Sequence, residues 1–194
     1  MSLPEGDKEY TYSDYLSWDH EERWEIIEGI PCMKAAPSRI HQEILMELSK
    51  QIANFLTGKG CRIYPAPFCV RLPGGNDKDD KEIKNVVEPD ITIVCDRSKL
   101  DDKGCKGAPD MIIEIVSPST ARKDRIEKFN LYEKAGVKEY WLIEPDEKIL
   151  SVFVLQNDNR YGRPEMYTEE DEVKVTVLPD LVIDLNSIFS AISE

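Results

Sequence analysis

The stretch that decides the fold is residues 108–120, which read APDMIIEIVSPST. Residues 111–116 form an apolar run of strand length that ends at Ser117-Pro118, and such a run is typical of a strand buried on both faces. Glu114 interrupts this run. Because a carboxylate is almost never fully buried without a partner, the sequence indicates that another group in the fold pairs with Glu114.

Length and composition place the chain among ordinary globular proteins. With 194 residues, of which 41% are hydrophobic and 32% charged, residues 1–194 are expected to form a single domain with a proper core. No apolar run approaches the roughly 20 residues that cross a bilayer, so no membrane partner is expected. The first ten residues contain no targeting pattern, which favours a cytoplasmic location.

The cysteines are odd in number and scattered. The five are Cys32, Cys61, Cys69, Cys95 and Cys105. They form no CxxC pair, so their spacing argues against a disulfide framework or a zinc site and fits a reducing compartment.

The net charge of -13 opposes nucleic-acid binding, because nucleic-acid binders normally carry a basic surface. The acidity is uneven, however. Residues 1–30 carry a net charge of -7, whereas residues 121–138, which follow Glu114 closely, carry +3. Both segments are most simply solvated surface, but the second is also the place where a local phosphate-binding field could arise.

Periodicity and turn residues predict a mixed sheet with helices packed on it. The expected elements are a hairpin at 24–35 turning at 29–31, a helix from Arg39 to Gly58 or Gly60, a strand at 61–72, a mobile loop at about 73–85, strands at 86–96 and 111–117, a helix at about 121–135 ended by Gly136, strands at 138–145 and 148–155, a strand near 173–178 and a short closing helix.

Asp90 is the residue that we expect to lie beside Glu114 in a site. It starts the apolar segment 91–95, directly after Pro89. If the two strands are neighbours, their carboxylates converge and repel each other, and a divalent cation that prefers carboxylate oxygen resolves the conflict. The alternative is structural: Asp90 forms an Asx turn and Glu114 pairs with an arginine or lysine. Either residue alone favours that alternative, but the pair favours Mg²⁺ or Mn²⁺ bound by Asp90 and Glu114.

Lys128 lies on the core-facing side of the helix predicted after Glu114. At about 100° per residue, with Ile126 at 0°, Lys128 falls near 200°, inside an apolar arc that runs from about 140° to 300°. A lysine there must either extend its ammonium to solvent or meet an acid. Two acids on adjacent strands favour an ammonium in the site.

His41 lies on the apolar side of the first long helix, three and four residues before Ile44 and Leu45. A lone histidine there is usually a core or capping residue. It becomes a candidate metal ligand or proton-transfer group only if the carboxylate pair exists.

Asp, a strand-borne Glu and Lys around a divalent ion suit phosphodiester hydrolysis, in which the metal activates water and the lysine offsets developing charge. No GxxxxGK[ST], GxGxxG or GxSxG motif is present.

The segments PDITIVCD and PDMIIEIVSPSTARKDRIEKFNLYEKAGVKEYWLIEP resemble the Uma family of bacterial endonucleases, a branch of the PD-(D/E)XK restriction-endonuclease-like superfamily. The resemblance covers residues 24–155. It implies an α/β restriction-endonuclease-like core of helix, three strands, helix and strand, here with an added N-terminal hairpin and C-terminal strands. It also matches Asp90 and Glu114 to the metal-binding acids.

The chain departs from the superfamily pattern at the lysine, because Val116 stands two residues after Glu114. The resemblance implies that the lysine has moved to the following helix, at Lys128. Together these features imply a Mg²⁺-dependent DNA endonuclease with Asp90, Glu114, Lys128 and His41 in its site. DNA binding is expected to be weak and salt-sensitive.

Two alternatives stay open. One is a metal-dependent phosphodiesterase acting on small or single-stranded nucleic acid, and the other is an inactive nuclease fold that serves as an interaction module. The sequence leaves the oligomeric state open, a homodimer included.

Overall fold

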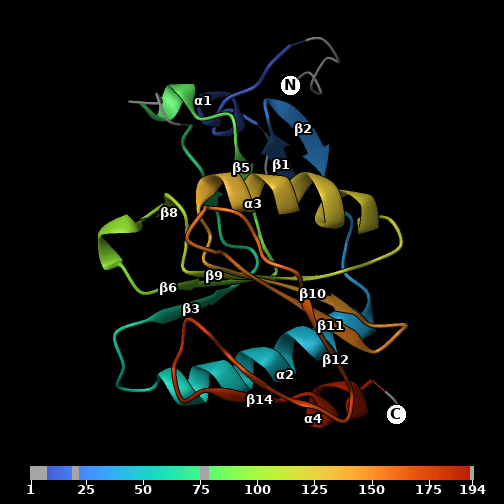
Figure 1. Ribbon diagram of the computed structural model, residues 1–194. Coiled ribbons are helices and arrows are strands. Elements are labelled where there is room, and N and C mark those ends of the chain that lie inside the picture. The colour runs from blue at the N-terminus through green and yellow to red at the C-terminus, as the bar shows by residue number, and fades with distance from the viewer. Residues whose placement is uncertain (1–7, 19–21, 75–78, 193–194) are drawn as a thin grey trace.

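A computed structural model describes residues 8–18, 22–74 and 79–192. A central six-stranded sheet lies between α3 (Phe129–Ala135) on one face and α2 (Arg39–Leu56) with α4 (Leu185–Ser190) on the other (Figure 1). The predicted α/β restriction-endonuclease-like architecture is therefore confirmed.

The central sheet has the order β12-β11-β10-β9-β6-β3. Its strands are β3 (Arg62–Pro65), β6 (Ile91–Val94), β9 (Met111–Ile115), β10 (Glu139–Glu144), β11 (Ile149–Val154) and β12 (Glu165–Thr168). Among the neighbouring strands described in this sheet, only β9 and β10 run parallel. They are joined by a helical crossover over residues 121–135. Its second half, α3, follows a π-helical stretch, η3 (Lys123–Lys128), and ends at Gly136 in the left-handed region, as predicted.

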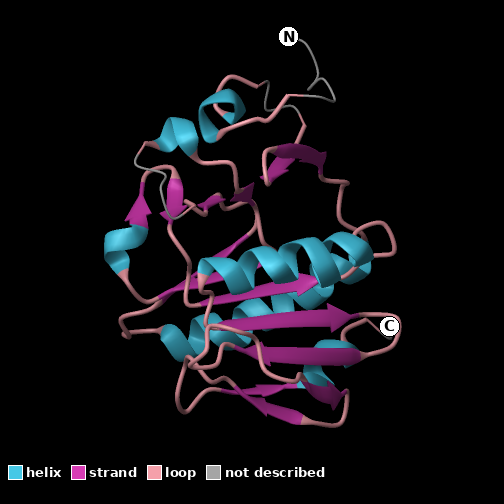
Figure 2. Cartoon of the chain, turned by 45° about the horizontal axis from the view of Figure 1, so that its top comes forward, coloured by secondary structure: helices cyan, strands magenta, loops and turns pink. Residues whose placement is uncertain are grey.

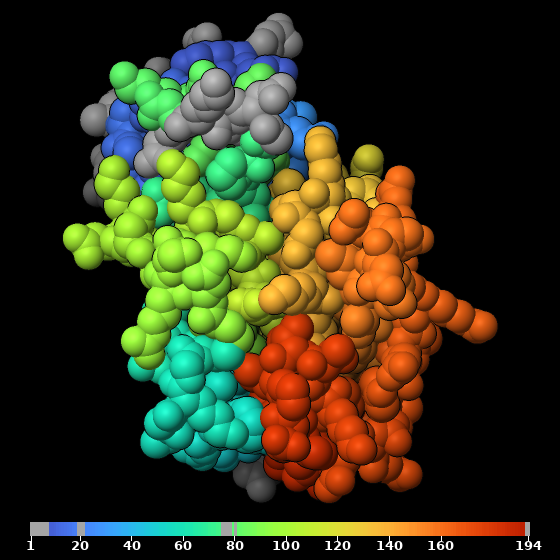
Figure 3. Space-filling view, turned by 60° about the vertical axis from the view of Figure 1, so that its left-hand side comes forward, coloured from blue at the N-terminus to red at the C-terminus, as the bar shows by residue number. Residues whose placement is uncertain are grey.

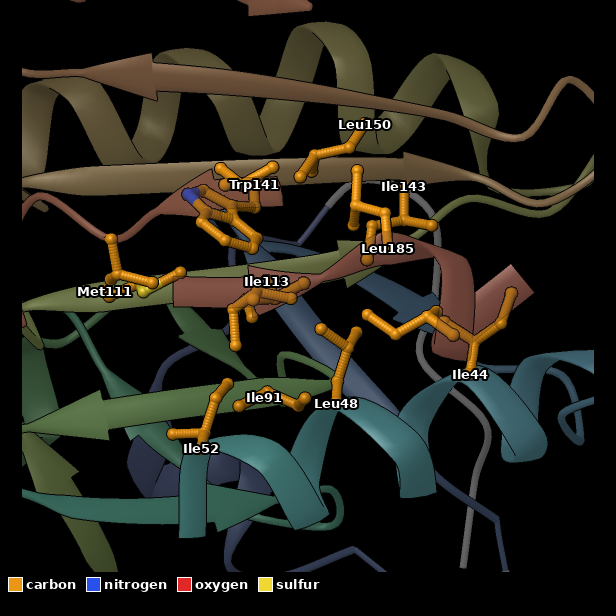
Figure 4. Packing of buried hydrophobic residues seen from close by; sticks show 14 of the residues in the cluster. Ile44, Leu48, Ile52, Ile91, Met111, Ile113, Trp141, Ile143, Leu150 and Leu185 are labelled. Carbon is orange, nitrogen blue, oxygen red and sulfur yellow. The ribbon is translucent and has the colours of Figure 1, made fainter. Parts of the chain in front are cut away.

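Strand β9 is buried on both faces, which confirms the expectation from its apolar run. Met111, Ile113 and Ile115 belong to the core cluster around α2 and Trp141, and Figure 4 shows the first two of them in it. Because side chains alternate along a strand, Ile112 packs on the opposite face, toward α3. Glu114 shares the parity of Ile112 and so faces the α3 side of the sheet.

A second sheet of short strands lies on the α3 side of the central sheet, as a separate group above it in Figure 2. Its order is β2-β1-β5-β4-β8-β7, with the strands β1 (Trp24–Ile27), β2 (Ile30–Met33), β4 (Val70–Arg71), β5 (Val86–Val87), β7 (Leu100–Asp101) and β8 (Gly104–Lys106). The predicted N-terminal hairpin is β1–β2, although Ile30 and Pro31 belong to β2 rather than to the turn. A short helix, α1 (Tyr12–Tyr15), packs beside it.

Two predicted strands are each divided between the two sheets. Residues 61–72 split into β3 and β4, and residues 86–96 split into β5 and β6. The breaks contain Pro67 and Pro89, and proline cannot donate to a strand ladder. The second break matters for the site, because it leaves Asp90 directly before β6.

The cysteine expectation is wrong for one pair, because Cys61 and Cys95 form a disulfide. They are 34 positions apart in sequence. In the β3–β6 register Arg62 lies opposite Val94, so the next position outward brings the two cysteines face to face. Spacing along the chain does not reveal a strand register, and so it could not reveal this pair.

The expected loop at 73–85 lies partly outside the described residues, at 75–78. Its described remainder includes a 3-10 turn, η1 (Asp80–Glu82), and the fully buried Ile83. A further 3-10 turn, η2 (Arg97–Lys99), precedes β7.

The C-terminal region adds β13 (Glu172–Lys174) and β14 (Val182–Asp184), which form an antiparallel pair. In the space-filling view of Figure 3, this region (red) lies beside the second half of α2 (teal), at the end of the molecule away from the N-terminal elements. Within the described residues, none of the helices combines the length and the apolar character needed to cross a membrane.

Candidate functional site

A cavity of about 260 Å³ lies at the end of β9, between the central sheet and the crossover helix. Its wall includes residues from β1, from the linker that leads into α2, from the first turn of α2, and from the start of η3. All four residues that the sequence singled out line it, namely His41, Asp90, Glu114 and Lys128.

Asp90 and Glu114 are brought together by strand register. In the β6–β9 pairing Ile91 lies opposite Ile113, so one position outward Asp90 lies opposite Glu114. Directly opposed residues on antiparallel strands project from the same face. The Ile115 N–H donates to Asp90 Oδ2 over 2.8 Å, which fixes the carboxylate at this edge of the sheet.

Glu114 is 2% exposed and has two close partners. Lys128 Nζ and the Tyr132 hydroxyl both donate to its Oε1, each over 2.7 Å. Burial raises the pKa of Glu114 to about 8, because the opposing effect of the Lys128 ammonium is partly offset by the nearby charges of Asp90 and Asp124. Lys128 and Tyr132 therefore explain how a carboxylate is tolerated in the middle of a buried strand.

Asp90 is 6% exposed and is held by three groups. Besides the Ile115 N–H, His41 Nε2 lies 3.1 Å from Oδ2, and Lys34 Nζ lies 3.9 Å from Oδ1. Burial alone would raise the pKa of Asp90, but His41, Lys34 and the Ile115 N–H bring it below its usual value. The imidazole thus orients the carboxylate that it contacts. The structure places His41 beside Asp90, as the functional interpretation of this histidine required.

Lys128 is 1% exposed and lies between three carboxylates. Its Nζ is 2.7 Å from Glu114 Oε1, 2.9 Å from Glu25 Oε1 and 3.8 Å from Asp124 Oδ1. Burial would lower the pKa of Lys128, but these carboxylates raise it well above its ordinary value. The side chain does not extend to solvent, so the structure favours the acid-contacting alternative for this lysine.

Three further charged residues of the cavity, each close to Asp90 or Lys128, were not predicted: Glu25, Lys34 and Asp124. Glu25 comes from β1, in a hairpin that no sequence pattern places near the central sheet. Its signal was present, since Glu25 interrupts the apolar segment 24–27 much as Glu114 interrupts its own. Asp124 also had a signal, because the wheel that selected Lys128 places it near 160°, just inside the same apolar arc.

The cavity wall suits a hard cation in its donor chemistry. Four carboxylates in it are buried, those of Glu25, Asp90, Glu114 and Asp124. They face one buried ammonium, Lys128, and one largely buried ammonium, Lys34. Among the buried side chains of the wall, acidic groups therefore outnumber basic ones, and a divalent cation binds favourably where acidic groups gather in a region of low dielectric.

No set of three or more His, Cys, Asp or Glu side chains in the described part of the chain is grouped closely enough to hold a metal ion. Mg²⁺ commonly binds through one or two carboxylates and completes its shell with water and substrate phosphate, whereas structural zinc needs a closed set of protein ligands.

The chain is similar to known proteins in sequence and in fold. A protein of Synechocystis sp. named only as uncharacterised protein slr1290 is 24% identical over 148 residues, which cover 75% of this chain and 74% of that protein. A crystal structure of a protein from Anabaena variabilis, described as a putative nuclease, superposes with a TM-score of 0.74. The two chains are 22% identical, and the match covers 93% of this chain and 98% of the other. At this identity the match establishes the fold.

The family comparison covers most of the chain. The model of the Uma2 family, described as "Putative restriction endonuclease", matches residues 12–186. This range includes Glu25, His41, the Asp90–Glu114 pair and Lys128. The chain therefore belongs to the Uma2 family.

Proposed function

We propose that this protein is a metal-dependent nuclease that hydrolyses phosphodiester bonds of DNA, with Mg²⁺ or Mn²⁺ held by Asp90 and Glu114. The observation that carries the proposal is the convergence of two cross-strand carboxylates and a buried lysine in one cavity. Membership of a family described as restriction endonucleases supports the same reaction class.

The residues of the chain have separate tasks in this proposal. When bound, the ion supplies Lewis-acid polarisation of a phosphoryl oxygen and of water. Lys128 presents its ammonium to the attacking water and to the charge that develops on the phosphoryl group. His41 keeps Asp90 in the orientation in which it is found, over the 3.1 Å contact. Hydrolysis then joins the water oxygen to phosphorus and releases the leaving strand as an alcohol.

The test is a cleavage assay on end-labelled DNA with Mg²⁺ or Mn²⁺, using wild type, Asp90→Asn, Glu114→Gln and Lys128→Met. Each substitution should lower kcat/KM by about 10²–10³-fold, as is usual when one group that stabilises transition-state charge is lost. Glu139→Gln is the matched control, because Glu139 is also a fully buried carboxylate on a strand but does not line the cavity. Absence of cleavage by the folded wild-type protein on varied DNA would refute the proposal.

A second candidate is a nuclease that acts only on unpaired strands or on small phosphodiesters. The burial of the site favours it: Asp90 and Glu114 are 6% and 2% exposed, at the bottom of a cavity of about 260 Å³. Duplex DNA would have to bend to bring a phosphate to them, at a cost of about 1–6 kcal/mol for a bend of 40–90°, whereas an unpaired strand is flexible. The net charge of -13 also disfavours the dense phosphates of a duplex.

The two candidates separate in one experiment. The same sequence is offered as a single strand, as a blunt duplex and as a duplex with a single-stranded tail. Cleavage confined to the single strand and the tail supports the second candidate, and equal cleavage within the duplex supports the first.

A further inference from the structure

The N-terminal hairpin supplies a carboxylate to the interior of the site. Strand β1 belongs to the second sheet, and Figure 1 shows the hairpin on the far side of α3 from the central sheet. Glu25, the second residue of β1, is only 1% exposed. Its side chain lines the same cavity as Asp90 and Glu114. A buried carboxylate that a strand of the second sheet contributes to a cavity beside the central sheet needs an explanation in the partners that it meets.

Those partners are two lysines and a backbone amide. Glu25 Oε1 lies 2.9 Å from Lys128 Nζ and 3.7 Å from Lys34 Nζ, and it accepts the Glu88 N–H over 3.0 Å. Glu88 is two residues before Asp90. The carboxylate of Glu25 is therefore held by the segment that leads into Asp90, and it contacts Lys128, the lysine that also contacts Glu114.

Lys128 has a conflict that Glu25 can resolve. Its ammonium donates to Glu114 Oε1 over 2.7 Å, so a cation that binds Glu114 must compete with Lys128. A fully buried ammonium that loses one carboxylate needs another, because an unpaired buried charge is strongly unfavourable. Glu25 is already in contact at 2.9 Å, whereas Asp124 lies farther away, at 3.8 Å.

We propose that Glu25 is a positioning residue that holds the Lys128 ammonium in the cavity while Glu114 turns to the divalent cation. The inference rests on the proposed function, since it assigns Glu114 to the ion. Glu25 itself does not bind the ion and does not touch the reacting phosphate. It makes the N-terminal hairpin part of the site rather than an appendage to the nuclease core.

The first part of the test separates contact from charge. Mn²⁺ affinity is measured by electron paramagnetic resonance in the absence of nucleic acid, for wild type, Glu25→Asp and Glu25→Gln. Aspartate keeps the charge but withdraws it from Lys128. We expect both variants to bind Mn²⁺ at least about fivefold more weakly, a size typical of coupling between residues in contact. If Glu25→Asp binds Mn²⁺ like wild type, Glu25 acts through its charge alone and the inference is overturned.

The second part separates positioning from ligation. The same two substitutions are made in a Lys128→Met background, or in Lys128→Gln if the methionine variant does not fold. A positioning residue acts through Lys128. In the background without Lys128, the factor by which the two Glu25 substitutions weaken Mn²⁺ binding should therefore be at least about fivefold smaller than in wild type. An equal loss with and without Lys128 would make Glu25 a ligand and overturn the inference. Glu139→Gln, which alters a buried carboxylate outside the cavity, should bind Mn²⁺ like wild type.

A third readout follows if wild type cleaves DNA. Glu25→Asp should lower kcat with little change in KM, because Lys128 rather than substrate binding is disturbed. Failure of the proposed function gives a different result from failure of this inference. Wild type that binds no Mn²⁺ at all overturns the metal-dependent reaction and the role of Glu25 with it, whereas equal losses in both backgrounds overturn the role of Glu25 alone.

Discussion

Lys128 and Glu114 form the central contact of the site, with Nζ 2.7 Å from Oε1 and both side chains almost fully buried. The two residues come from consecutive elements, β9 and η3, which are joined by the short segment 116–122. The lysine therefore reaches back over the end of the strand that precedes its own helix. In this way an ammonium on a helix lies beside a carboxylate on a strand that ends one residue before Val116.

Removing Lys128 should destabilise the protein at neutral pH. Its ammonium balances Glu25, Glu114 and Asp124, and loss of one partner of a buried ion pair typically costs about 3–5 kcal/mol. Lys128→Met should lower the free energy of unfolding in urea by that amount at pH 7. The exposed Lys134 is the control, and Lys134→Met should stay within about 0.5 kcal/mol of wild type. Equal stability of the two variants would mean that the three carboxylates do not depend on Lys128.

His41 should affect cation binding through Asp90. Partners that orient a ligand typically contribute about 10–100-fold to metal affinity, and His41 Nε2 contacts Asp90 Oδ2 directly. His41→Ala should therefore weaken Mn²⁺ binding by about tenfold or more in calorimetry. Asn54→Ala, on an exposed position of the same helix, should leave it unchanged. Wild-type affinity in His41→Ala would return His41 to the role of a core residue.

DNA binding should be weak and should fall steeply with salt. In the basic segment 121–138, Arg125 already pairs with Glu144 and Lys138 with Asp110. Lys123 lines the cavity, and Arg122 is 85% exposed next to it. Replacing both by alanine should reduce the slope of log K against log salt by about 1 to 2, since each phosphate contact contributes about 0.7 to 0.9.

Fluorescence anisotropy at several salt concentrations measures that slope. Lys50→Ala with Lys59→Ala, at two exposed positions that do not line the cavity, serves as the control and should leave the slope unaltered. Binding of equal strength at low and high salt would show that phosphate contacts do not drive association.

Asp110 should give the protein a stability that is lost in acid. Burial would raise the pKa of Asp110, but the Lys138 ammonium and the Cys95 N–H, at 2.6 and 2.7 Å, bring it below its usual value. A carboxyl whose pKa is lowered by folding stabilises the native state above its unfolded pKa, about 3.9, and this contribution disappears as the pH falls through the folded value.

Asp110→Asn should therefore cost about 1.5–3 kcal/mol at pH 7, the range for hydrogen bonds to charged groups, and progressively less below pH 4. Urea unfolding across this pH range measures the difference. Asp102→Asn, at an exposed position, should track wild type throughout. A difference that stays constant into acid would show that the charge of Asp110 does not contribute.

The parts of the fold that could be predicted are those that depend on patterns within a single segment. The helix from Arg39, the strand around Glu114 and the helix ended by Gly136 follow from periodicity and caps within each segment. The proline breaks at Pro67 and Pro89 were visible as residues, but the sequence does not say that the chain changes sheet there. The prediction about the cysteines was wrong for a related reason, because the Cys61–Cys95 bond depends on the register between two strands.

The residues of the site also differ in whether a local pattern could predict them. Asp90, Glu114 and Lys128 could be selected because each is a charged residue in an apolar pattern. Their convergence needed a register and a crossover that the family resemblance implied. Glu25 and Lys34 come from a hairpin whose position is set by packing with β5, far along the chain. No local pattern in residues 24–35 predicts which part of the molecule that hairpin will meet.

The passage of the chain from β5 to β6 takes only three residues, Glu88, Pro89 and Asp90. Within this short connector, Glu88 is anchored to the hairpin by Arg23 and Glu25, and Asp90 is anchored to the central sheet by the Ile115 N–H. The connector thus joins the two sheets, and its contacts fix the position of Asp90, the residue proposed to bind the ion. A chain shortened to begin after the hairpin could keep every strand of the central sheet and still lose the alignment of Asp90. Truncation or fusion in the N-terminal region is accordingly expected to disturb the position of Asp90 as well as the stability of the fold.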